Sequence, residues 1–318
     1  MFLIGIDERY VREISRIIVK YSGFLESNTI DIFDTRYYPP PDLDNESVLR
    51  YFLVMVAMDH RLSRPGKSYE ACLEDGCYHG ADLLYRLGVK MLLENPSFFD
   101  PSYLRDIRVE QVINWLSVSS ATPPDPYIRT MLLRDLGLKL LKLYNSSVES
   151  ILEGSRGYLR GGYEHYGLLD YLRVFRAYED PVEKKSLLFV KFITARKLFN
   201  PRDKPSIPVD NHLTRIALRL GLVMVSGKLW DKIRSGLEVS TVEDILLRFA
   251  VREAYDQLIN YSGLDIRVLD DFLWNHGRRV CLKDKPICDI CVFRESCLAY
   301  RDRNFMVNEH VYYNTWYY

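Results

Sequence analysis

The sequence has no hydrophobic run long enough to cross a bilayer, and it shows no secretion signal. The longest apolar run, Tyr51 to Met58, spans eight residues, whereas a membrane helix needs about 20. Asp7 and Glu8 directly follow the apolar residues 1–6, so no signal peptide is recognisable. We therefore expect a cytoplasmic protein that has no membrane partner.

The chain also lacks net charge, because 43 basic side chains balance 43 acidic ones. No global positive field therefore indicates nucleic acid. The balance is uneven along the chain: residues 1–120 hold 13 basic and 18 acidic side chains, whereas residues 121–318 hold 30 and 25. A polyanionic partner is thus expected to contact mainly the second half.

Sustained alternation of apolar and polar residues, the pattern of half-buried strands, is missing. Apolar residues instead recur at helical spacing. The predicted helices cover residues 46–61, 79–94, 109–118, 127–144, 167–178, 182–199, 210–222, 241–261 and 267–280. Proline-containing breaks separate several of them, because proline lacks the amide donor that a helix interior needs. The predicted fold class is all-α, with short strands near 30–38 left open.

Cysteine is scarce, and four of the six cysteines crowd into seventeen residues. Cys281, Cys288, Cys291 and Cys297 follow the spacing C-x6-C-x2-C-x5-C. A zinc site with four thiolates is one alternative, but zinc modules usually contain two separate C-x2-C pairs. One compact loop of four cysteines is better matched to an iron–sulfur cluster. A disulfide framework is not expected in a cytoplasmic protein, so the remaining Cys72 and Cys77 are interpreted as small buried hydrophobic residues.

The cysteine loop, with its lead-in Asn-His-Gly-Arg at 275–278 and its Lys285-Pro286, resembles the [4Fe–4S] loop of the endonuclease III family. That family belongs to the helix-hairpin-helix DNA glycosylase superfamily. The resemblance implies that the four cysteines hold a [4Fe–4S] cluster and that the loop meets the DNA backbone. The expected phosphate contacts are Arg278, Arg279, Lys283 and Lys285. The alternative is a solvated basic turn.

A second segment, Val-Asp-Asn-His at 209–212, is similar to the V-D-x-H segment of the same family. The resemblance implies that Asp210 is catalytic and opens a helix. A carboxylate held at a helix N-terminus can stabilise the positive charge that develops on a sugar as its base leaves. The alternative is that Asp210 is a plain N-cap.

In the bifunctional family members, the lysine nucleophile is the K of an L-P-G-x-G-x-K-T pattern. This sequence departs from that pattern. Residues 179–191 contain no glycine. They are more similar to the archaeal 8-oxoguanine glycosylase branch, in which the lysine precedes a hydroxyl residue on an apolar helix. On that resemblance Lys185, which precedes Ser186, is the nucleophile, and Lys184 and Lys191 are the other candidates. Each could instead be a solvated helix lysine.

A third segment, at 268–274, resembles the L-D-x-x-L-W stretch of the archaeal branch, which borders the base pocket. Asp270 and Trp274 are four residues apart, so both face one side of a helix. Together they could stack on a flipped base and bind its polar edge. The alternative is a core tryptophan and a surface acid.

The resemblance implies two helical domains with a DNA-binding cleft between them. Residues 40–199 would form a helical bundle that ends in a hairpin-like element. Residues 1–39 and 200–303 would form the cluster domain, and residues 304–318 an aromatic tail that packs as an arm, an oligomer contact or a stacking surface.

The predicted function is a monomeric DNA glycosylase with AP-lyase activity that removes an oxidised base from double-stranded DNA. The base would be 8-oxoguanine or an oxidised pyrimidine. The alternative is a non-catalytic iron–sulfur protein that binds nucleic acid and keeps the glycosylase fold. The neutral charge and the missing glycine hairpin favour that alternative.

Overall fold

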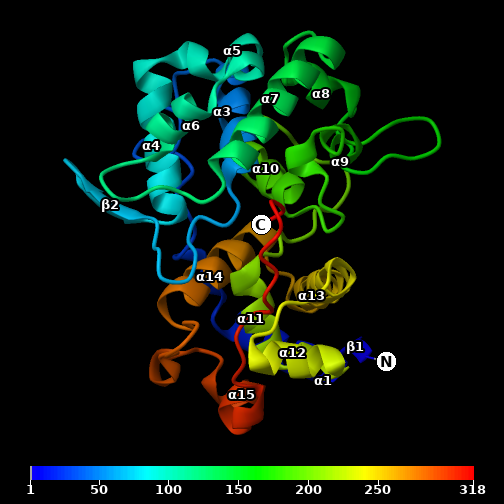
Figure 1. The fold of residues 1–318 in the computed structure, drawn as a ribbon. Coiled ribbons are helices and arrows are strands. Elements are labelled where there is room, and N and C mark those ends of the chain that lie inside the picture. The colour runs from blue at the N-terminus through cyan, green and yellow to red at the C-terminus, as the bar shows by residue number, and fades with distance from the viewer. Residues whose placement is uncertain (1) are drawn as a thin grey trace. The chain divides into compact units, whose positions relative to one another are not determined.

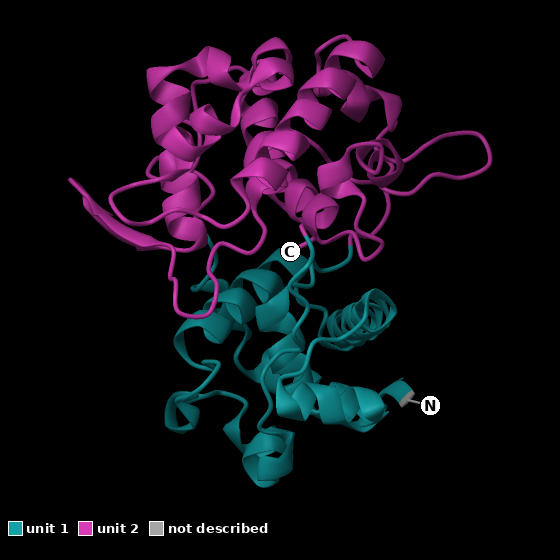
Figure 2. Cartoon of the chain, in the orientation of Figure 1, with its two compact units in different colours: residues 1–30, 206–315 teal, residues 31–205, 316–318 magenta. Residues whose placement is uncertain are grey.

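The computed structural model describes residues 2–318, which form two compact units (Figure 1; Figure 2). Unit 1 contains the chain up to Ile30 and Ser206–Thr315, and unit 2 contains Asp31–Pro205 and Trp316–Tyr318. The helical bundle is expected at residues 40–199 from the sequence, whereas unit 2 begins at residue 31 and its first segment ends at residue 205. Within the described residues, no helix is both long and apolar enough to span a membrane.

Unit 1 is helical apart from one two-stranded sheet. Its elements are β1 (Phe2–Ile6), α1 (Glu8–Lys20), α2 (Ser22–Glu26), α11 (Asn211–Leu220), β4 (Val223–Gly227), α12 (Lys228–Ser235), α13 (Thr241–Ser262), α14 (Ile266–Arg279), η3 (Cys288–Ile290), η4 (Arg294–Ser296), α15 (Leu298–Arg301) and η5 (Arg303–Phe305). Strand β1 pairs antiparallel with β4, with Ile4 opposite Val225, so the start of the chain packs beside the segment that follows α11.

The core of unit 1 lies between α1, α11, α13 and α14. Helix α1 packs against α13, and α11 packs against both α13 and α14. Helix α1 buries Val11, Ile14 and Ile18, which recur at helical spacing and form one apolar stripe. The Asp7 side chain accepts hydrogen bonds from the backbone amides of Arg9 and Tyr10 and so caps the first turn of α1.

Unit 2 is a helical bundle with one short hairpin. Its elements are α3 (Asn45–Met58), β2 (Glu70–Leu73), β3 (Gly76–His79), α4 (Ala81–Glu94), η1 (Pro96–Phe99), α5 (Pro101–Asp106), α6 (Val109–Leu116), α7 (Pro126–Leu143), α8 (Glu149–Gly154), α9 (Leu168–Leu172), η2 (Arg176–Tyr178) and α10 (Lys184–Ala195).

Helix α3 is the centre of this bundle. Every residue from Tyr51 to Met58 is buried, which explains why the longest apolar run of the sequence occurs here. The helix packs against α4, α7 and α10. A helix that is apolar on all sides can only be stable when neighbouring helices surround it, so α3 fixes the positions of the others.

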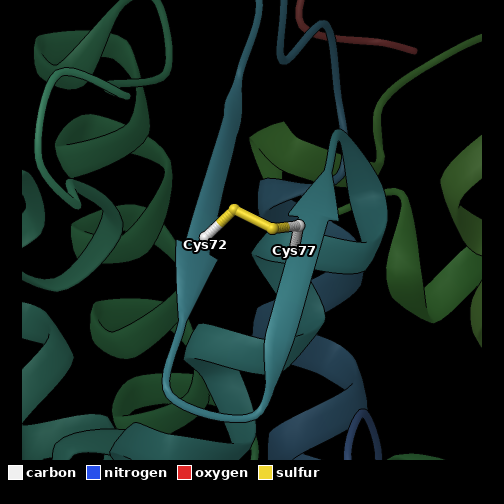
Figure 3. Close-up of a disulfide and its surroundings, with 2 residues drawn as sticks. All are labelled: Cys72 and Cys77. Carbon is white, nitrogen blue, oxygen red and sulfur yellow. A yellow bond between two sulfur atoms is a disulfide. The ribbon is translucent and has the colours of Figure 1, made fainter.

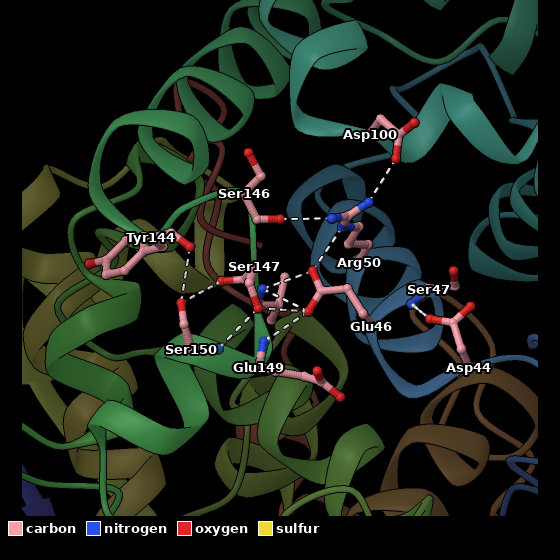
Figure 4. Close-up of polar contacts among 11 residues, drawn as sticks. Asp44, Glu46, Ser47, Arg50, Asp100, Tyr144, Ser146, Ser147, Glu149 and Ser150 are labelled. Carbon is pink, nitrogen blue, oxygen red and sulfur yellow. Dashed lines mark hydrogen bonds and ion pairs between the residues drawn. The ribbon is translucent and has the colours of Figure 1, made fainter.

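The first turn of α3 also anchors α8 (Figure 4). The Glu46 carboxylate accepts hydrogen bonds from the backbone amides of Val148, at 2.9 and 3.0 Å, and Glu149, at 3.0 Å. These are amides at the N-terminus of α8 that have no partner within that helix. Arg50, four residues after Glu46, donates to it at 2.8 Å and reaches Asp100 at 2.7 Å. One ion-pair network thus joins α3, α8 and the start of α5.

The hairpin of unit 2 corrects the interpretation of two cysteines. Cys72 and Cys77 are exposed and form a disulfide across β2 and β3, and they are not the buried hydrophobic residues expected from the sequence (Figure 3). The turn at Glu74 and Asp75 pairs the two residues directly, with their Cα atoms 3.9 Å apart. The pairing is therefore local and spans only one turn.

The all-α fold class is confirmed, since the strands of the described chain are confined to two small two-stranded sheets. Residues 30–38, where short strands were left open, form none. Most predicted helices are present with ends shifted by a few residues, as at α7 and α13. The predicted helix at 167–178 is instead the short α9 followed by the single turn η2.

Helices α5 and α7 pack so closely that Gly137 has no room for a side chain. A Cβ atom at this position would lie 2.5 Å from the Arg105 backbone nitrogen and 2.6 Å from the Pro101 carbonyl oxygen. Backbone atoms within a helix cannot move aside cheaply, so the helices would have to separate. Gly137→Ala is therefore expected to lower the free energy of unfolding by about 1–3 kcal/mol, as measured by chemical denaturation.

The matched control for this prediction is Gly23→Ala on α2, where a Cβ atom would have no neighbour within 4 Å. Alanine has the higher helix propensity, so this variant is expected to be neutral or slightly more stable. Equal stability of both variants and the wild-type protein would contradict the close packing of α5 and α7.

Candidate functional site

The segment before α10 forms a turn without glycine. Glu183, the N-cap residue of α10, adopts a left-handed conformation with φ of 64°, which glycine usually occupies. Its buried carboxylate is held by Arg160 at 2.7 Å and Arg173 at 3.1 Å. Asp180 accepts hydrogen bonds from the backbone amides of Val182 and Lys184, both at 3.0 Å. Side-chain contacts therefore hold the backbone where the family pattern has glycines.

Lys185 lies on the first turn of α10 and is fully buried. Its Nζ donates to the Ala57 carbonyl oxygen at 2.6 Å and lies 3.2 Å from His60 Nδ1. Burial lowers the pKa of Lys185 well below its usual value, and the positive charges of Lys184 and Arg129 add to the effect. An amine in these surroundings favours the neutral form that can act as a nucleophile.

The other two candidate lysines differ from Lys185. Lys184 is buried, but its Nζ is ion-paired with Asp59 at 3.3 Å and donates to the Asp59 carbonyl oxygen at 3.1 Å. Lys191 lies on the same helix, two turns further along, and is partly exposed. Within residues 2–318, Lys185 therefore differs from Lys184 because no carboxylate is ion-paired with its amine.

The end of α3 is surrounded by buried cations. Arg129, which is fully buried, donates to the carbonyl oxygens of Met58 at 2.5 Å and of His60 and Arg61 at 2.9 Å. The last carbonyls of a helix have no partner within the helix. Lys185 and Arg129 thus satisfy carbonyls at the end of α3, and both depend on that helix for their position.

Asp210 is the N-cap of α11, as the sequence predicts. Its side chain accepts a hydrogen bond from the Leu213 amide at 2.9 Å, and its carbonyl oxygen accepts one from Thr214 Oγ1 at 2.8 Å. The residue is partly exposed. Its carboxylate is therefore fixed at the positive end of the helix dipole and retains access to solvent.

Two buried arginines on α11 hold the cysteine loop against that helix. Arg215 and Arg219 are each 2% exposed. Arg215 donates to the carbonyl oxygens of Gly277, at 2.7 Å, and Cys281, at 3.1 Å. Arg219 donates to those of Leu282 and Lys283, both at 2.7 Å, and its Nη1 lies 3.4 Å from Cys281 Sγ. The helix that begins with Asp210 therefore also fixes the loop that begins with Cys281.

The glycine of the His-Gly-Arg lead-in has a steric role in this arrangement. A Cβ atom at Gly277 would lie 2.8 Å from the Cβ of His212. Helices α11 and α14 can therefore pack closely only because position 277 has no side chain. His212 itself is largely buried, and burial lowers its pKa although the nearby Asp210 opposes the change.

The four cysteines of the loop line one small cavity. It has a volume of about 30 Å³, and its remaining lining is mostly apolar, with Ile216, Leu220 and Phe293 among the residues. Burial raises the pKa of the Cys291 thiol to about 12, and the neighbouring cysteines act in the same direction. Four thiolates cannot be gathered here without a compensating cation, which is the chemistry that a metal centre supplies.

In the described structure, the side chains that line this cavity are not yet in a metal-binding arrangement. Across residues 2–318, the structure has no group of three or more His, Cys, Asp or Glu side chains already arranged to hold a metal ion. The donor set nevertheless fits an iron–sulfur cluster, since four unpaired cysteines from one loop share one apolar cavity. Cys291 Sγ also lies 3.3 Å from His276 Nε2, the histidine of the lead-in.

The C-terminal tail packs against the same helices of unit 1. Glu309 is ion-paired with Arg215 at 2.6 Å and with Lys283 at 3.3 Å. Burial raises the pKa of Glu309, but the two cations outweigh it and lower the pKa to about 2. His310 is bonded to the buried Asp244 at 2.7 Å. The tail up to Thr315 is thus part of unit 1, and only Trp316–Tyr318 belong to unit 2.

The four basic residues expected at the DNA backbone have different environments. Arg279 and Lys285 are exposed. The Arg278 guanidinium lies 4.2 Å from the centre of the Trp274 ring. Lys283 is half-exposed and ion-paired with Glu309. Arg279 and Lys285 therefore present the least restrained positive charges of the four.

Asp270 and Trp274 both lie on α14, as their spacing predicts. Asp270 is buried, and Trp274 is half-buried beneath the Arg278 guanidinium. The alternative of a surface acid at position 270 is therefore excluded. Their role at a base pocket stays a prediction.

Sequence reasoning missed the residues that surround Lys185 and the cysteine loop. His60 and Arg129 are buried beside Lys185, and Arg215 and Arg219 are buried beside the loop. The only available signal was the placement of arginines on otherwise apolar helix faces. Such arginines usually have buried partners, but the sequence does not say which.

Comparison with known proteins supports the family resemblance. No family model matches the chain. An endonuclease III from Sulfolobus acidocaldarius is 34% identical over 95 residues, which is 30% of this chain and 33% of the relative's length. The chain thus matches the curated relative over about a third of that protein.

Solved structures extend the likeness to nearly the whole chain. A trapped endonuclease III–DNA covalent intermediate with an estranged adenine superposes with a TM-score of 0.55 at 15% identity, over 92% of this chain and 98% of the other. A non-covalent endonuclease III–DNA complex gives a TM-score of 0.51 at 15% identity, over 92% and 97%. The chain therefore shares its fold with these endonuclease III structures and is similar in sequence to an endonuclease III over 95 residues.

Proposed function

We propose that the chain is a DNA base-excision glycosylase with AP-lyase activity that acts on an oxidised base, 8-oxoguanine or an oxidised pyrimidine. One observation carries the proposal: in the described part of the chain, Lys185 is a buried lysine whose Nζ has two acceptors and no ion-paired carboxylate. The fold supports it, because the superposed endonuclease III was solved as a covalent intermediate with DNA.

In the proposed reaction, the lone pair of Lys185 Nζ forms a bond to the sugar carbon that carries the base. The bond from that carbon to the base breaks, and its electron pair leaves with the base. Loss of a proton from the nitrogen and opening of the sugar ring then give a Schiff base. In β-elimination a base removes a proton from the sugar carbon next to the Schiff base, and that C–H electron pair forms a double bond. The bond to the 3′ oxygen then breaks, and the phosphate leaves with its electron pair, which cuts the strand.

Asp210 is proposed to stabilise the positive charge that develops on the sugar. The cap contacts with Leu213 and Thr214 fix the carboxylate before substrate binds, so no reorganisation is needed during the reaction. Asp270 and Trp274 are proposed to border the pocket of the extruded base.

Cys281, Cys288, Cys291 and Cys297 would hold a [4Fe–4S] cluster that supplies structural order to the loop. With the loop so ordered, Arg278, Arg279, Lys283 and Lys285 would bind phosphates of double-stranded DNA without reading its sequence. Lys283 would do so only in competition with Glu309.

The second candidate function is a non-catalytic iron–sulfur protein that binds nucleic acid. One observation favours it: Lys185 exposes no surface and satisfies a carbonyl at the end of α3, as a structural lysine would. Borohydride trapping separates the two functions, because only a lysine that forms a Schiff base becomes covalently linked to DNA.

Lys185→Gln is expected to abolish borohydride trapping and strand cutting while DNA affinity stays nearly unchanged. Glutamine keeps a donor for the Ala57 carbonyl but has no nucleophilic amine. Cutting of duplexes with a panel of oxidised bases gives the activity, and electrophoretic mobility shift gives the affinity. Lys184→Gln and Lys191→Gln are the matched controls, and trapping that disappears in either of them alone would move the nucleophile there.

Asp210→Asn is expected to slow base release by about a hundredfold to a thousandfold, because it removes the charge opposite the developing cation. Asparagine caps helices as well as aspartate does, so the melting temperature should change little. The matched control is Asp44→Asn on α3, whose carboxylate makes the same 2.9 Å contact with an amide three residues later. Base release at the wild-type rate in Asp210→Asn would exclude the proposed role.

The purified protein is expected to be brown and to contain about four irons per chain. Cys291→Ser should lose the iron and much of the soluble yield, because the fold of the loop depends on its metal. Replacing both Cys72 and Cys77 by serine is the control, since this exposed pair lies in unit 2 and should leave the iron content unchanged. Zinc in place of iron after anaerobic purification would refute the cluster.

A further inference from the structure

His60 is a buried histidine that the proposed reaction does not use. It follows the end of α3 and is 3% exposed. Its Nδ1 lies 3.2 Å from Lys185 Nζ, and its Nε2 is buried without a hydrogen-bond partner in the described structure. A buried imidazole whose polar neighbours are a buried amine and the Ala57 backbone calls for an explanation.

The number of hydrogen-bond partners around Lys185 Nζ indicates which form of the amine fits the site. Within residues 2–318, Nζ has two possible acceptors, the Ala57 carbonyl oxygen and His60 Nδ1. A charged ammonium has three N–H donors and would leave one of them buried and unpaired. A neutral amine has two, and each would have an acceptor while the lone pair stays free.

The charges around the pair keep His60 available as an acceptor. Burial lowers the pKa of His60 well below its usual value, and the positive charges of Arg129 and Lys184, with that of Lys185 whenever it is protonated, add to this effect, which a hydrogen bond with the Ala57 backbone opposes without reversing it. The carboxylates that face Lys185 belong to Asp59 and Asp180. Asp59 is ion-paired with Lys184, and Asp180 accepts backbone amides at the start of α10.

We propose that His60 is a positioning residue for Lys185. Its Nδ1 accepts one N–H of the amine, holds the lysine in the neutral form and leaves the nitrogen lone pair free for the sugar carbon. This inference rests on the proposed lysine nucleophile. His60 lies outside the cysteine loop, the helix that begins with Asp210 and the lysines of α10. The proposed reaction gives its imidazole no other role.

The test measures single-turnover borohydride trapping against pH on a duplex that contains a preformed abasic site. His60→Phe fills the space without an acceptor and is expected to slow trapping on the order of 100-fold, because the amine is no longer oriented. His60→Gln returns an acceptor and should recover most of that loss. His60→Asp places a negative charge beside the amine and should move the acidic limb of the rate profile up by about one to three pH units.

His165→Phe is the matched control, because His165 is also in unit 2, is partly buried and also has a buried Nε2 without a partner. It is expected to leave the pH profile where it is in the wild-type protein. A merely structural role of His60 would lower the melting temperature of His60→Phe and His60→Asp without moving the acidic limb of the profile, and that result would overturn the proposal.

A second measurement does not depend on catalysis. The folded-state pKa of Lys185 lies below the unfolded value of 10.5, so the unfolded chain binds more protons between the two values. The free energy of unfolding contributed by this residue therefore rises with pH across that window and levels off above it. Lys185→Met should remove this rise, and His60→Asp should confine it to higher pH.

The two measurements separate the inference from the proposed function. If the wild-type protein is not trapped at any pH but Lys185 and His60 still govern the pH dependence of unfolding, the proposed lysine-dependent lyase function fails and the neutral pair stands. If trapping occurs and neither the trapping profile nor the unfolding profile responds to His60→Asp, the proposed function stands and the role of His60 is refuted.

Discussion

Buried basic side chains that donate hydrogen bonds to backbone carbonyl oxygens are the interaction on which both units depend. In unit 2, Lys185 and Arg129 satisfy the carbonyls at the end of the central helix α3. In unit 1, Arg215 and Arg219 satisfy those of the cysteine loop. A buried carbonyl without a donor costs about 1–3 kcal/mol, so each of these basic side chains stabilises a chain segment that could not otherwise be buried. The candidate functional groups are placed on the same segments.

In this arrangement, the choice between arginine and lysine decides whether a buried donor serves stability alone or can also act chemically. An arginine stays charged when buried, because its pKa is high and its charge is delocalised, so it can act as a permanent structural donor. A lysine in the same position loses its proton more readily. The chain uses Arg129, Arg215 and Arg219 where several carbonyls must be bonded, and a lysine at position 185, where a neutral amine has a chemical use.

The helical fold and the cysteine loop could be predicted from the sequence because both are local signals. Apolar residues at helical spacing identify α7 and α13 almost to the residue, and the loop ligands lie within seventeen positions. The hairpin with Cys72 and Cys77 was missed although Asp75-Gly76 marks its turn, because the strands are only four residues long. The contacts of His60 with Lys185 join residues 125 positions apart, and no periodicity reports such a pair.

Glu183 illustrates a further limit of motif reasoning. The missing glycine before α10 favoured the non-catalytic alternative, yet a glutamate adopts the left-handed conformation there and is held by two arginines. A strained backbone position costs on the order of 1 kcal/mol and persists when surrounding contacts over-determine it. A family pattern therefore records one solution to a backbone requirement, and ion pairs from elsewhere in the chain provide another.

The path of the chain has a consequence for how the protein comes apart. The backbone passes from one unit to the other three times, after Ile30, after Pro205 and after Thr315. A single proteolytic nick at any of these points leaves two covalent connections between the units, and the two fragments are then held together by the packing within the units. Neither unit is a continuous stretch of sequence, so the shortest continuous segment that contains all of unit 1 is 1–315, and the shortest that contains all of unit 2 is 31–318. Separating the two units therefore requires rejoining chain ends, as in a circular permutant, rather than shortening the chain.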